Sequence, residues 1–352
     1  MSLTSLTTED VLFTTQGPLA RIVLNRPRAI NALTLPMVRD LHALLDRFAA
    51  DAAIGAVVVQ GAGERGLCSG GDVRAVRQHV ADTGDAGPFF ATEYAMNAAV
   101  ADFPKPYVAL MDGIVMGGGV GVSAHGSVRL ATTRTRLAMP ETTIGFTADV
   151  GAQWWLSRTP GRIGAWMALT SDALDGAGAV AAGFADVLVA PEVMTRLTDL
   201  DAGPDPWLLA VAESGTADLA VLGETVPDSP LAAGGAARAW IDECFGGWDV
   251  ATILDRLAAH PEPAARECLE TLRQRCPFSL VVTLEAMRRA STMGTVHEVL
   301  AQDTQVCPRV AELPDFAEGV RAQLVDKDRR PTWRDSSIQA VDPAVVERVF
   351  AA

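Results

Sequence analysis

A strand, a glycine-rich turn and a helix follow one another repeatedly in the first half of the chain. Residues 56–59 are all alanine or valine and predict a buried strand; a glycine-rich turn follows, and a helix is expected from about Asp72. The same order recurs where residues 107–111 predict a strand, residues 117–119 a turn and residues 120–125 the start of a helix. Such alternation predicts an α/β domain.

Two further strands and one long helix fit the same pattern. Residues 20–24 predict a strand that ends before Pro27, and residues 128–131 predict another. A helix is expected from Pro36, with Thr34 as its cap. Its apolar positions recur at helical spacing and are Met37, Val38, Leu41, Leu44, Leu45 and Phe48.

The second half of the chain has a different character. Residues 201–239 are rich in Ala, Gly, Asp and Pro and predict a connector with loosely packed helical pieces. Residues 263–324 carry apolar side chains at helical spacing. We therefore predict an α/β core over residues 1–195, a connector over residues 196–240 and a helical region over residues 241–352.

Composition excludes several classes of protein. The formal net charge of −14 argues against nonspecific nucleic-acid binding, which requires Lys and Arg against phosphates. The five cysteines lack CxxC spacing, which argues against a disulfide framework or a zinc site. No apolar run reaches the roughly 18 residues of a membrane span, and no secretory signal is visible. We predict a cytoplasmic globular protein without a membrane or nucleic-acid partner.

Two glycine-rich turns predict a site for a negatively charged oxygen. Residues 68–72 (CSGGD) and 116–121 (MGGGVG) each follow a predicted strand and precede a helix. Glycine turns at such places expose backbone N–H groups and let a ligand come close. Two facing turns could hold one oxygen anion as an oxyanion hole, although a single such turn is usually only a turn.

Two acidic residues near these turns are candidates for catalysis. Glu141 follows Pro140 in an apolar stretch, and Asp149 precedes Val150-Gly151. Each also has an ordinary structural explanation, since carboxylates cap helices, pair with arginine or form turns. His125 is interpreted as a packed side chain that forms a local hydrogen bond. Cys68 is likewise assigned to packing, because no histidine partner is evident.

The order and spacing of these motifs resemble the crotonase superfamily over about residues 10–190. The segments that carry the resemblance are LNRP at 24–27, NAL at 31–33, CSGGD at 68–72, MDG at 111–113, GGG at 117–119 and PE at 140–141 with Gly145. The resemblance implies a spiral of ββα units and an acyl-CoA thioester substrate. It also implies that the backbone N–H groups of Gly71 and Gly118 form the oxyanion hole.

A finer resemblance is to the 3-hydroxyisobutyryl-CoA hydrolases. It rests on residues 111–126, 138–142 and 149–151 and on three C-terminal segments, at 315–322, 326–328 and 331–333. It implies that Glu141 and Asp149 are the catalytic carboxylates. This chain departs from the subfamily at Ala148, where a proline is usual. Trp154 and Trp155 would border the acyl pocket.

The resemblance also implies how the substrate is bound. Only Lys105 and Lys327 among the 29 basic residues are lysines, so CoA phosphates would be held mainly by arginine. The candidate substrate-binding residues are Arg26, Arg28, Asp72, Arg74, Gly117 and Gly121. No metal and no redox cofactor are expected, because CoA enters as part of the substrate. Members of the superfamily form trimers or dimers of trimers, and this subfamily includes monomers.

The predicted function is hydrolysis of 3-hydroxyisobutyryl-CoA to 3-hydroxyisobutyrate and CoA, a step of valine catabolism. Glu141 would attack the thioester or activate water, and these two roles stay open. One alternative is an enoyl-CoA hydratase or isomerase on the same scaffold. Hydratases carry a second glutamate where Gly121 stands, which argues against that alternative. Another alternative is a non-catalytic acyl-CoA-binding protein.

Overall fold

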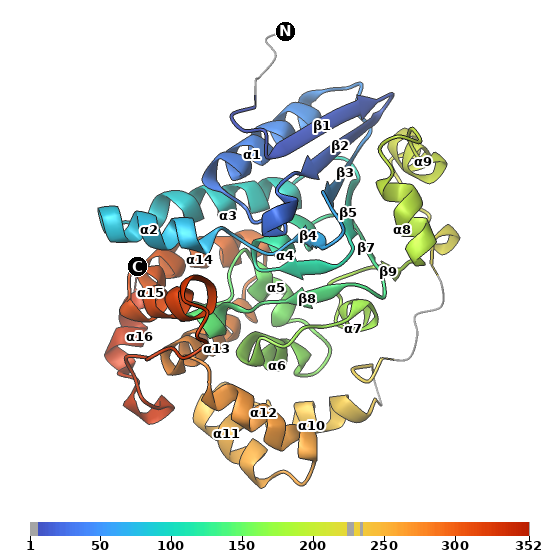
Figure 1. Ribbon diagram of the computed structural model, residues 1–352. Helices are drawn as coiled ribbons and strands as arrows, with labels where there is room; N and C mark the ends of the chain where they lie inside the picture. Colours follow the sequence, from blue (N-terminus) through green and yellow to red (C-terminus); the bar gives the residue numbers. More distant parts are fainter. Residues whose placement is uncertain (1–5, 224–228, 233–234, 352) are drawn as a thin grey trace. The chain divides into compact units, whose positions relative to one another are not determined.

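The computed structural model describes residues 6–223, 229–232 and 235–351 (Figure 1). Contacts between residues group the chain into two compact units. Unit 1 comprises Met1–Gly71, Ala95–Leu137 and Leu174–Pro227, and unit 2 comprises Asp72–Tyr94, Ala138–Ala173 and Asp228–Ala352. Each unit thus combines segments that lie far apart in sequence. The sequence ranges proposed above for core, connector and helical region stay predictions, because they divide the chain along its length and not by contacts.

A six-stranded sheet forms the centre of unit 1, in the order β1-β2-β3-β5-β7-β9. Its strands are β1 (Val11–Gln16), β2 (Leu19–Leu24), β3 (Ala56–Gly61), β5 (Tyr107–Met111), β7 (Val128–Ala131) and β9 (Val187–Leu188). β1 pairs with β2 in antiparallel register, and the other neighbours are parallel. β2 and β5 are buried along their whole length, as expected for strands covered on both faces.

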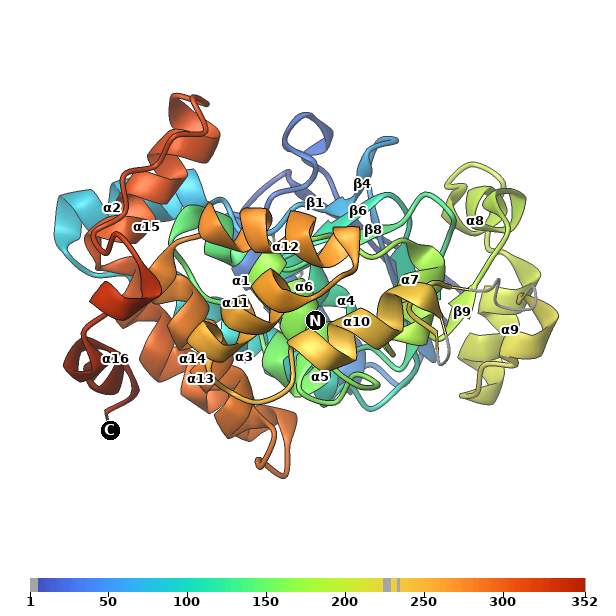
Figure 2. The ribbon, with the colours of Figure 1, turned by 90° about the horizontal axis from the view of Figure 1, so that it is seen from below.

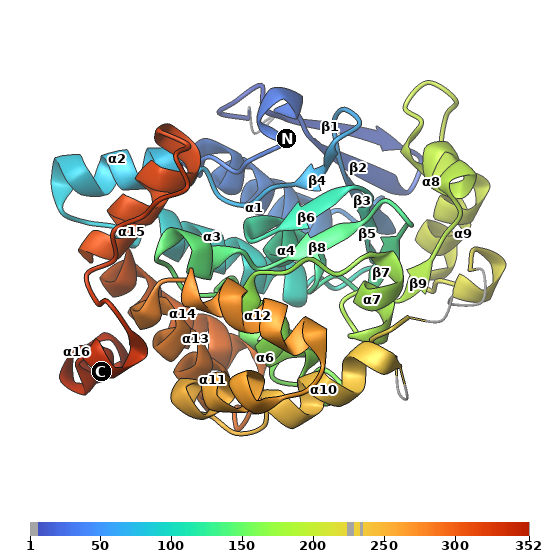
Figure 3. The same cartoon turned by 60° about the horizontal axis from the view of Figure 1, so that its bottom comes forward.

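A second, three-stranded sheet has the order β4-β6-β8, and its strands lie side by side in Figure 3. The strands are β4 (Gly66–Cys68), β6 (Ile114–Met116) and β8 (Arg136–Ala138). Three times along the chain, a strand of the large sheet is followed by a strand of the small sheet and then by a helix. These three units are β3-β4-α2, β5-β6-α4 and β7-β8-η2. This repeated ββα unit confirms the predicted α/β class and spiral.

The helices that complete unit 1 are mostly short. They are η1 (Pro27–Ala29), α1 (Leu35–Ala50), the part of α3 (Gly87–Ala101) from Ala95 on, α4 (Gly118–Ser123), α7 (Gly176–Ala181), α8 (Pro191–Thr198), α9 (Pro206–Ser214) and η3 (Leu219–Val221). α1 begins as predicted: the Thr34 hydroxyl accepts a hydrogen bond from the N–H of Met37 at 3.4 Å, and Pro36 lies in the first turn. The four predicted strands are β2, β3, β5 and β7. The short strands β4 and β6 were not assigned from their residues.

Part of the predicted connector packs more tightly than its composition suggests. α9 contacts β2 and β3, and its Leu208 and Val211 are almost completely buried in the core on that face of the sheet. Gly55 lies so close to α9 that a Cβ atom there would be 1.8 Å from the carbonyl oxygen of Ala212. The expectation of loose packing is therefore wrong for Pro206–Ser214. Residues 224–228 and 233–234 of the same segment lie outside the described residues.

Unit 2 is mainly helical, as expected for residues 263–324. Its elements are α2 (Val73–Thr83), the part of α3 (Gly87–Ala101) up to Tyr94, η2 (Glu141–Ile144), α5 (Ala152–Leu156), α6 (Ile163–Thr170), α10 (Ala236–Cys244), α11 (Val250–Ala259), α12 (Pro263–Arg273), α13 (Pro277–Ala290), α14 (Val296–Ala311), α15 (Pro314–Val320), the π-helical turn η4 (Arg321–Val325), η5 (Ile338–Ala340) and α16 (Pro343–Phe350). Figure 2 shows α10 and α12 beside α6, which they contact. Prolines in the first turn start α12, α13, α15 and α16.

Two glycines allow η2 and α15 to pack backbone against backbone. A Cβ atom on Gly319 of α15 would lie 2.2 Å from the carbonyl carbon of Ile144 in η2. A Cβ atom on Gly145, which ends η2 with φ +69°, would lie 2.2 Å from the carbonyl oxygen of Asp315. Neither contact can relax by moving a flexible side chain, so both positions require glycine. The C-terminal motif at residues 315–322 thus supports the short helix that carries Glu141.

We expect Gly319→Ala to destabilise the protein by about 1–3 kcal/mol, the usual cost of forcing extra atoms into a packed interior. At an open helical site the same change would stabilise, since alanine favours a helix more than glycine. Thermal unfolding monitored by circular dichroism measures the difference. Gly294→Ala is the control, because a Cβ atom there meets its nearest neighbour, Glu298, only at 3.8 Å. Equal melting temperatures for the two variants would contradict the packing argument.

Candidate active site

Glu141 is buried at the start of η2. Pro140 precedes it, and Gly145 ends the short helix in a left-handed conformation. Only 6% of the residue is exposed, and its Oε2 has no hydrogen-bond partner among the described residues. A buried carboxyl oxygen without a partner is unusual, because leaving it unsatisfied costs about 1–3 kcal/mol. Such an atom is a candidate for contact with a ligand or a water molecule.

Asp149 is the first residue of a tight turn. The N–H of Ala152 donates to the Asp149 carbonyl at 2.8 Å, and both central residues have positive φ, +53° at Val150 and +72° at Gly151. The Asp149 side chain is buried, and its Oδ2 accepts a hydrogen bond of 2.6 Å from the Tyr94 hydroxyl. Asp149 is therefore a turn residue, as its structural explanation predicted, and also a buried carboxylate with a defined partner.

Two further acids belong to the same cluster and were missed in the sequence. Glu93 of α3 and Asp303 of α14 are only 2% and 1% exposed. Glu93 is the only charged residue of α3, and that isolation was a usable signal. Asp303 lies four residues after Val299 and four before Cys307, so helical periodicity places it on the buried face. Neither signal is specific without a fold.

The pKa values of these carboxyl groups are raised because they are buried together. Burial raises the pKa of Glu141 well above its ordinary value, and the negative charges of Asp149 and Glu93 raise it further. Burial raises the pKa of Asp149 to about 7, although the hydrogen bond from Tyr94 opposes the shift. Burial and the charge of Asp149 likewise raise the pKa values of Glu93 and Asp303. A carboxyl group with the pKa of Asp149 can exchange a proton near neutral pH.

Aromatic rings in unit 2 account for part of this burial. Phe90 stacks on Phe146 with ring centroids 5.2 Å apart, and Phe90 also stacks on Tyr94 at 5.9 Å. Phe146 in turn contacts Phe316 of α15 at 5.4 Å. Phe146 lies between Glu141 and Asp149 in the sequence, so its ring brings apolar surface to the segment that carries both carboxylates. An apolar surrounding disfavours the ionised form of each acid.

The two glycine-rich turns come together in unit 1. β4 and β6 are parallel neighbours, so the turns that follow them lie at one edge of the small sheet. A Cβ atom on Gly70 would be 3.6 Å from the backbone nitrogen of Gly118. Gly118 is the first residue of α4, so its N–H has no partner within that helix. Gly117, with φ +50°, caps α4, and Gly71 forms a bridge to Leu33. The oxyanion hole stays a prediction that this geometry permits.

The other predicted binding residues have varied environments. Arg26 donates to the carbonyl of Ala32 at 2.6 Å, and Arg74 of α2 donates to the carbonyl of Leu324. Arg28 is exposed, and Asp72 caps α2 by accepting from the N–H of Ala75. Gly121 is buried within α4. The contacts of Arg26 and Arg74 are those of structural arginines, so their predicted contact with CoA stays untested.

The Asp149 turn is flanked in the sequence by Ala148 before it and by Trp154 and Trp155 after it. Ala148 is buried, and its carbonyl accepts a hydrogen bond from the side-chain amide of Gln153. The two tryptophans belong to α5 and are half-buried. The guanidinium of Arg158 lies 3.4 Å from the centroid of the Trp154 ring. That these tryptophans border the acyl pocket stays a prediction.

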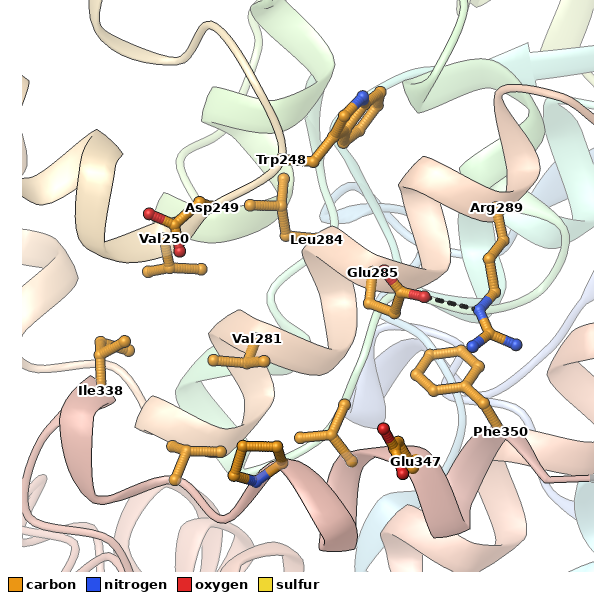
Figure 4. Close-up of a pocket in the computed structure, with 13 residues that line it drawn as sticks. Trp248, Asp249, Val250, Val281, Leu284, Glu285, Arg289, Ile338, Glu347 and Phe350 are labelled. Carbon is orange, nitrogen blue, oxygen red and sulfur yellow. Dashed lines mark hydrogen bonds and ion pairs between the residues drawn. The ribbon is translucent and has the colours of Figure 1, made fainter.

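A pocket of about 430 Å³ lies in unit 2 between α11, α13, η5 and α16 (Figure 4). Val250, Val281 and Leu284 contribute apolar surface, and Glu285 and Arg289 form an ion pair of 2.7 Å at its wall. None of the clustered acids Glu93, Glu141, Asp149 and Asp303 lines this pocket.

Within the described residues, no group of three or more His, Cys, Asp and Glu side chains is arranged to hold a metal ion. All five cysteines are free and buried.

Comparison with known proteins assigns the family. A model described as enoyl-CoA hydratase/isomerase matches residues 19–350, which is nearly the whole chain. The chain belongs to the enoyl-CoA hydratase/isomerase family. The predicted crotonase resemblance, which covered residues 10–190, therefore holds and extends through the C-terminal helices.

Within this family, curated relatives share about a third of their residues with the chain. The mitochondrial 3-hydroxyisobutyryl-CoA hydrolase of Danio rerio is 35% identical, over 97% of this chain and 90% of that protein. The proteins of the same name from Rattus norvegicus and Homo sapiens are 36% and 35% identical, over 95% of this chain and 86% of each protein. The predicted resemblance to the 3-hydroxyisobutyryl-CoA hydrolases is thus confirmed, because the chain is similar to these proteins over nearly its whole length.

Solved structures of the family have the same fold. A carnitinyl-CoA dehydratase from Mycobacterium thermoresistibile is 41% identical, with a TM-score of 0.88 over 98% of this chain and 97% of that one. An enoyl-CoA hydratase from Rhodobacter sphaeroides 2.4.1 is 36% identical, with a TM-score of 0.87 over 97% of each chain. These matches confirm the crotonase fold.

None of the described helices is long and apolar enough to cross a membrane. The names of the curated relatives place those proteins in mitochondria. The cytoplasmic location predicted for this chain therefore stays a prediction that its relatives do not support.

The raised pKa of Asp149 predicts how stability depends on pH. The folded state keeps a proton up to about pH 7 that the unfolded chain releases near 3.8, so stability falls as the pH rises between these values. Asp149→Asn removes the charge and keeps an acceptor for Tyr94. We expect it to raise the melting temperature, and by more at pH 8 than at pH 5.

Glu285→Gln is a control of opposite sign for this experiment. Hydrogen bonds from Arg288 and Arg289 hold the pKa of Glu285 below its ordinary value. Its contribution to stability is present above the unfolded pKa and is lost only in more acidic solution. This variant should therefore melt lower than wild type, by similar amounts at pH 5 and pH 8. A pH-independent effect of Asp149→Asn would contradict the raised pKa.

Proposed function

We propose that this protein hydrolyses the thioester of 3-hydroxyisobutyryl-CoA to 3-hydroxyisobutyrate and CoA, as a step of valine catabolism. The observation that carries the proposal is the pair of buried carboxyl groups of Glu141 and Asp149: Oε2 of Glu141 has no hydrogen-bond partner among the described residues, and Asp149 is held by Tyr94. Burial raises the pKa of both groups, and that of Asp149 to about 7. The similarity to curated hydrolases over nearly the whole chain supports the choice of substrate.

In the proposed mechanism, the thioester carbonyl accepts hydrogen bonds from the N–H groups of Gly71 and Gly118. Glu141 attacks the carbonyl carbon or removes a proton from an attacking water, and Asp149 orients water or carries a proton. If Glu141 attacks, a C–O bond to its carboxylate forms as the C–S bond breaks, and water then hydrolyses the resulting anhydride and restores Glu141. If Glu141 acts as base, the C–O bond forms directly to water as the C–S bond breaks. In both routes the departing thiolate takes up a proton that comes from the water. The two N–H groups would stabilise the oxyanion formed on the way, a contribution typically worth about 3 kcal/mol per donor.

Binding in this proposal needs no metal and no redox cofactor, because CoA belongs to the substrate. Arg26, Arg28 and Arg74 are the proposed partners of the CoA phosphates, and Asp72, Gly117 and Gly121 are proposed to contact substrate. Trimer, dimer of trimers and monomer all remain compatible with the family, and light scattering on the purified protein distinguishes them.

Hydration of an enoyl-CoA is the main rival, because the two solved structures reported above are named as a dehydratase and a hydratase. Hydratases that resemble this chain carry a second glutamate at the position of Gly121. Glycine has no side chain that could hold or deprotonate water there. A non-catalytic acyl-CoA-binding protein is the other rival, and the buried acids of high pKa argue against it.

A panel of acyl-CoA thioesters separates these functions. We expect release of free thiol from 3-hydroxyisobutyryl-CoA and negligible loss of enoyl absorbance from crotonyl-CoA. Thiol release is followed with a chromogenic disulfide, and hydration by ultraviolet absorbance. Loss of enoyl absorbance without thiol release would instead make the protein a hydratase. Binding detected by calorimetry with neither reaction would make it a binding protein.

Glu141→Gln tests the proposed catalytic carboxylate. The amide keeps the size of the side chain but removes its ability to act as base or nucleophile, so we expect turnover to fall about 100-fold or more. Binding of the acyl-CoA, measured by isothermal titration calorimetry, should survive. Glu285→Gln changes another glutamate in unit 2 and should leave the rate unchanged. A Glu141→Gln rate above about a tenth of wild type would contradict the proposed role.

A further inference from the structure

The turn that carries Asp149 is strained. Val150 has φ +53°, in the left-handed region that β-branched residues rarely adopt. Strain of this kind costs on the order of 1–3 kcal/mol and persists only where the surroundings fix the backbone. Because Val150 directly follows Asp149, the same strained backbone determines where the Asp149 carboxyl group lies.

The side chain of Asp303 holds this turn by a hydrogen bond to the backbone of the turn. The N–H of Gly151 donates to Oδ2 of Asp303 at 2.8 Å. Asp303 comes from α14, about 150 residues further along the chain, and is 1% exposed. Because Gly151 is the second central residue of the turn, this bond fixes the peptide group between the strained Val150 and Gly151. A hydrogen bond to a buried acid is a costly one to lose.

Tyr94 holds the side chain of the same residue. Its hydroxyl donates to Oδ2 of Asp149 at 2.6 Å, and its ring stacks on Phe90. Burial raises the pKa of Tyr94 well above its ordinary value, so the hydroxyl keeps its proton and remains a donor. The bond therefore fixes the direction of the Asp149 carboxyl group within the cluster.

We propose that Tyr94 and Asp303 are positioning residues of the reaction, with Tyr94 orienting the Asp149 carboxyl group and Asp303 fixing the turn that carries it. The proposal deepens the hydrolase assignment and rests on it. Neither residue needs to touch the substrate. Their effect passes through Asp149, so it must alter the titration and the turnover of the enzyme more than its affinity for acyl-CoA.

The titration of Asp149 depends on every group that faces it. These groups are Glu93 and Tyr94 from α3, Glu141 from η2, and Asp303 and Cys307 from α14. The acids repel a negative charge on Asp149, whereas the hydroxyl of Tyr94 stabilises it. Removing that hydroxyl takes away the larger of the two hydrogen bonds that lower the pKa of Asp149 and leaves only a backbone hydrogen bond to oppose burial. The pKa of Asp149 should then rise.

Tyr94→Phe tests the orienting bond without needing activity. In protein labelled with ¹³C at the aspartate carboxyl carbons, the resonance of Asp149 is the one that Asp149→Asn removes. We expect its titration midpoint to move to higher pH in Tyr94→Phe. The pH profile of kcat for thiol release should move in the same direction, with a loss on the order of tenfold at pH 7. Tyr107→Phe removes the other tyrosine hydroxyl of the chain and should leave both midpoints unchanged.

Asp303 is tested with a conservative and a non-conservative variant. Asp303→Asn keeps an oxygen that accepts from the N–H of Gly151, whereas Asp303→Leu has similar size but no acceptor. We expect Asp303→Asn to retain most of the wild-type kcat. Asp303→Leu should lose on the order of 10- to 100-fold in kcat, the effect of a small misplacement of a reacting group. KM should change little in both variants.

Separate outcomes would overturn each proposal. An unshifted Asp149 resonance in Tyr94→Phe, or equal kcat values for folded Asp303→Asn and Asp303→Leu, would refute the positioning role. If wild-type protein releases no thiol from any acyl-CoA, the hydrolase assignment fails. The carboxyl titration would still show whether Tyr94 controls the ionisation of Asp149. Should Asp303→Leu not fold, the Tyr94→Phe titration alone decides the matter.

Discussion

Burial of four acidic side chains in one compact unit is the constraint on which the rest of the structure depends. Removing a carboxylate from water is costly, and in practice such a group takes up a proton instead. Burial raises the pKa of Glu93, Glu141, Asp149 and Asp303, and the charge of Asp149 raises the pKa of the other three further. This burial lowers stability at neutral pH, because the folded state disfavours the charged form that the unfolded chain adopts there. A sequence selected only for stability would replace these acids.

Close backbone packing lets two distant parts of the chain build this cluster. η2 presents Glu141, and it contacts α15 through Gly145 and Gly319, where no side chain fits. α14 contributes Asp303 to the Asp149 turn. Both supporting helices come from the last quarter of the sequence. The C-terminal motif thus has a structural role, since Gly319 and Asp315 lie within it and contact the segment that carries Glu141.

The sequence predicted the strands and helices of the fold well but only some residues of the site. The physical reason differs from one residue to the next. Strands such as β3 are runs of valine, and the helix at Pro36 carries its own start signals, so local pattern suffices. β4 and β6 have three residues each beside glycines, which is too short for a pattern. Glu141 and Asp149 stood out by motif. Tyr94 and Asp303 lie inside helices, and only the fold brings them to Asp149.

The left-handed backbone at Val150 shows most clearly why the geometry of the site could not be predicted from local sequence alone. Sequence preference favours an extended or helical conformation for valine, and glycine or asparagine would suit this position better. The conformation exists because tertiary contacts outweigh local preference, and the bond from Gly151 to Asp303 is one such contact. The place of the Asp149 carboxyl group is therefore set by two residues from other elements: Tyr94 holds the side chain, and Asp303 holds the backbone of the turn. Local sequence preference cannot reveal such support, because both contacts form only once the helices that carry Tyr94 and Asp303 are packed.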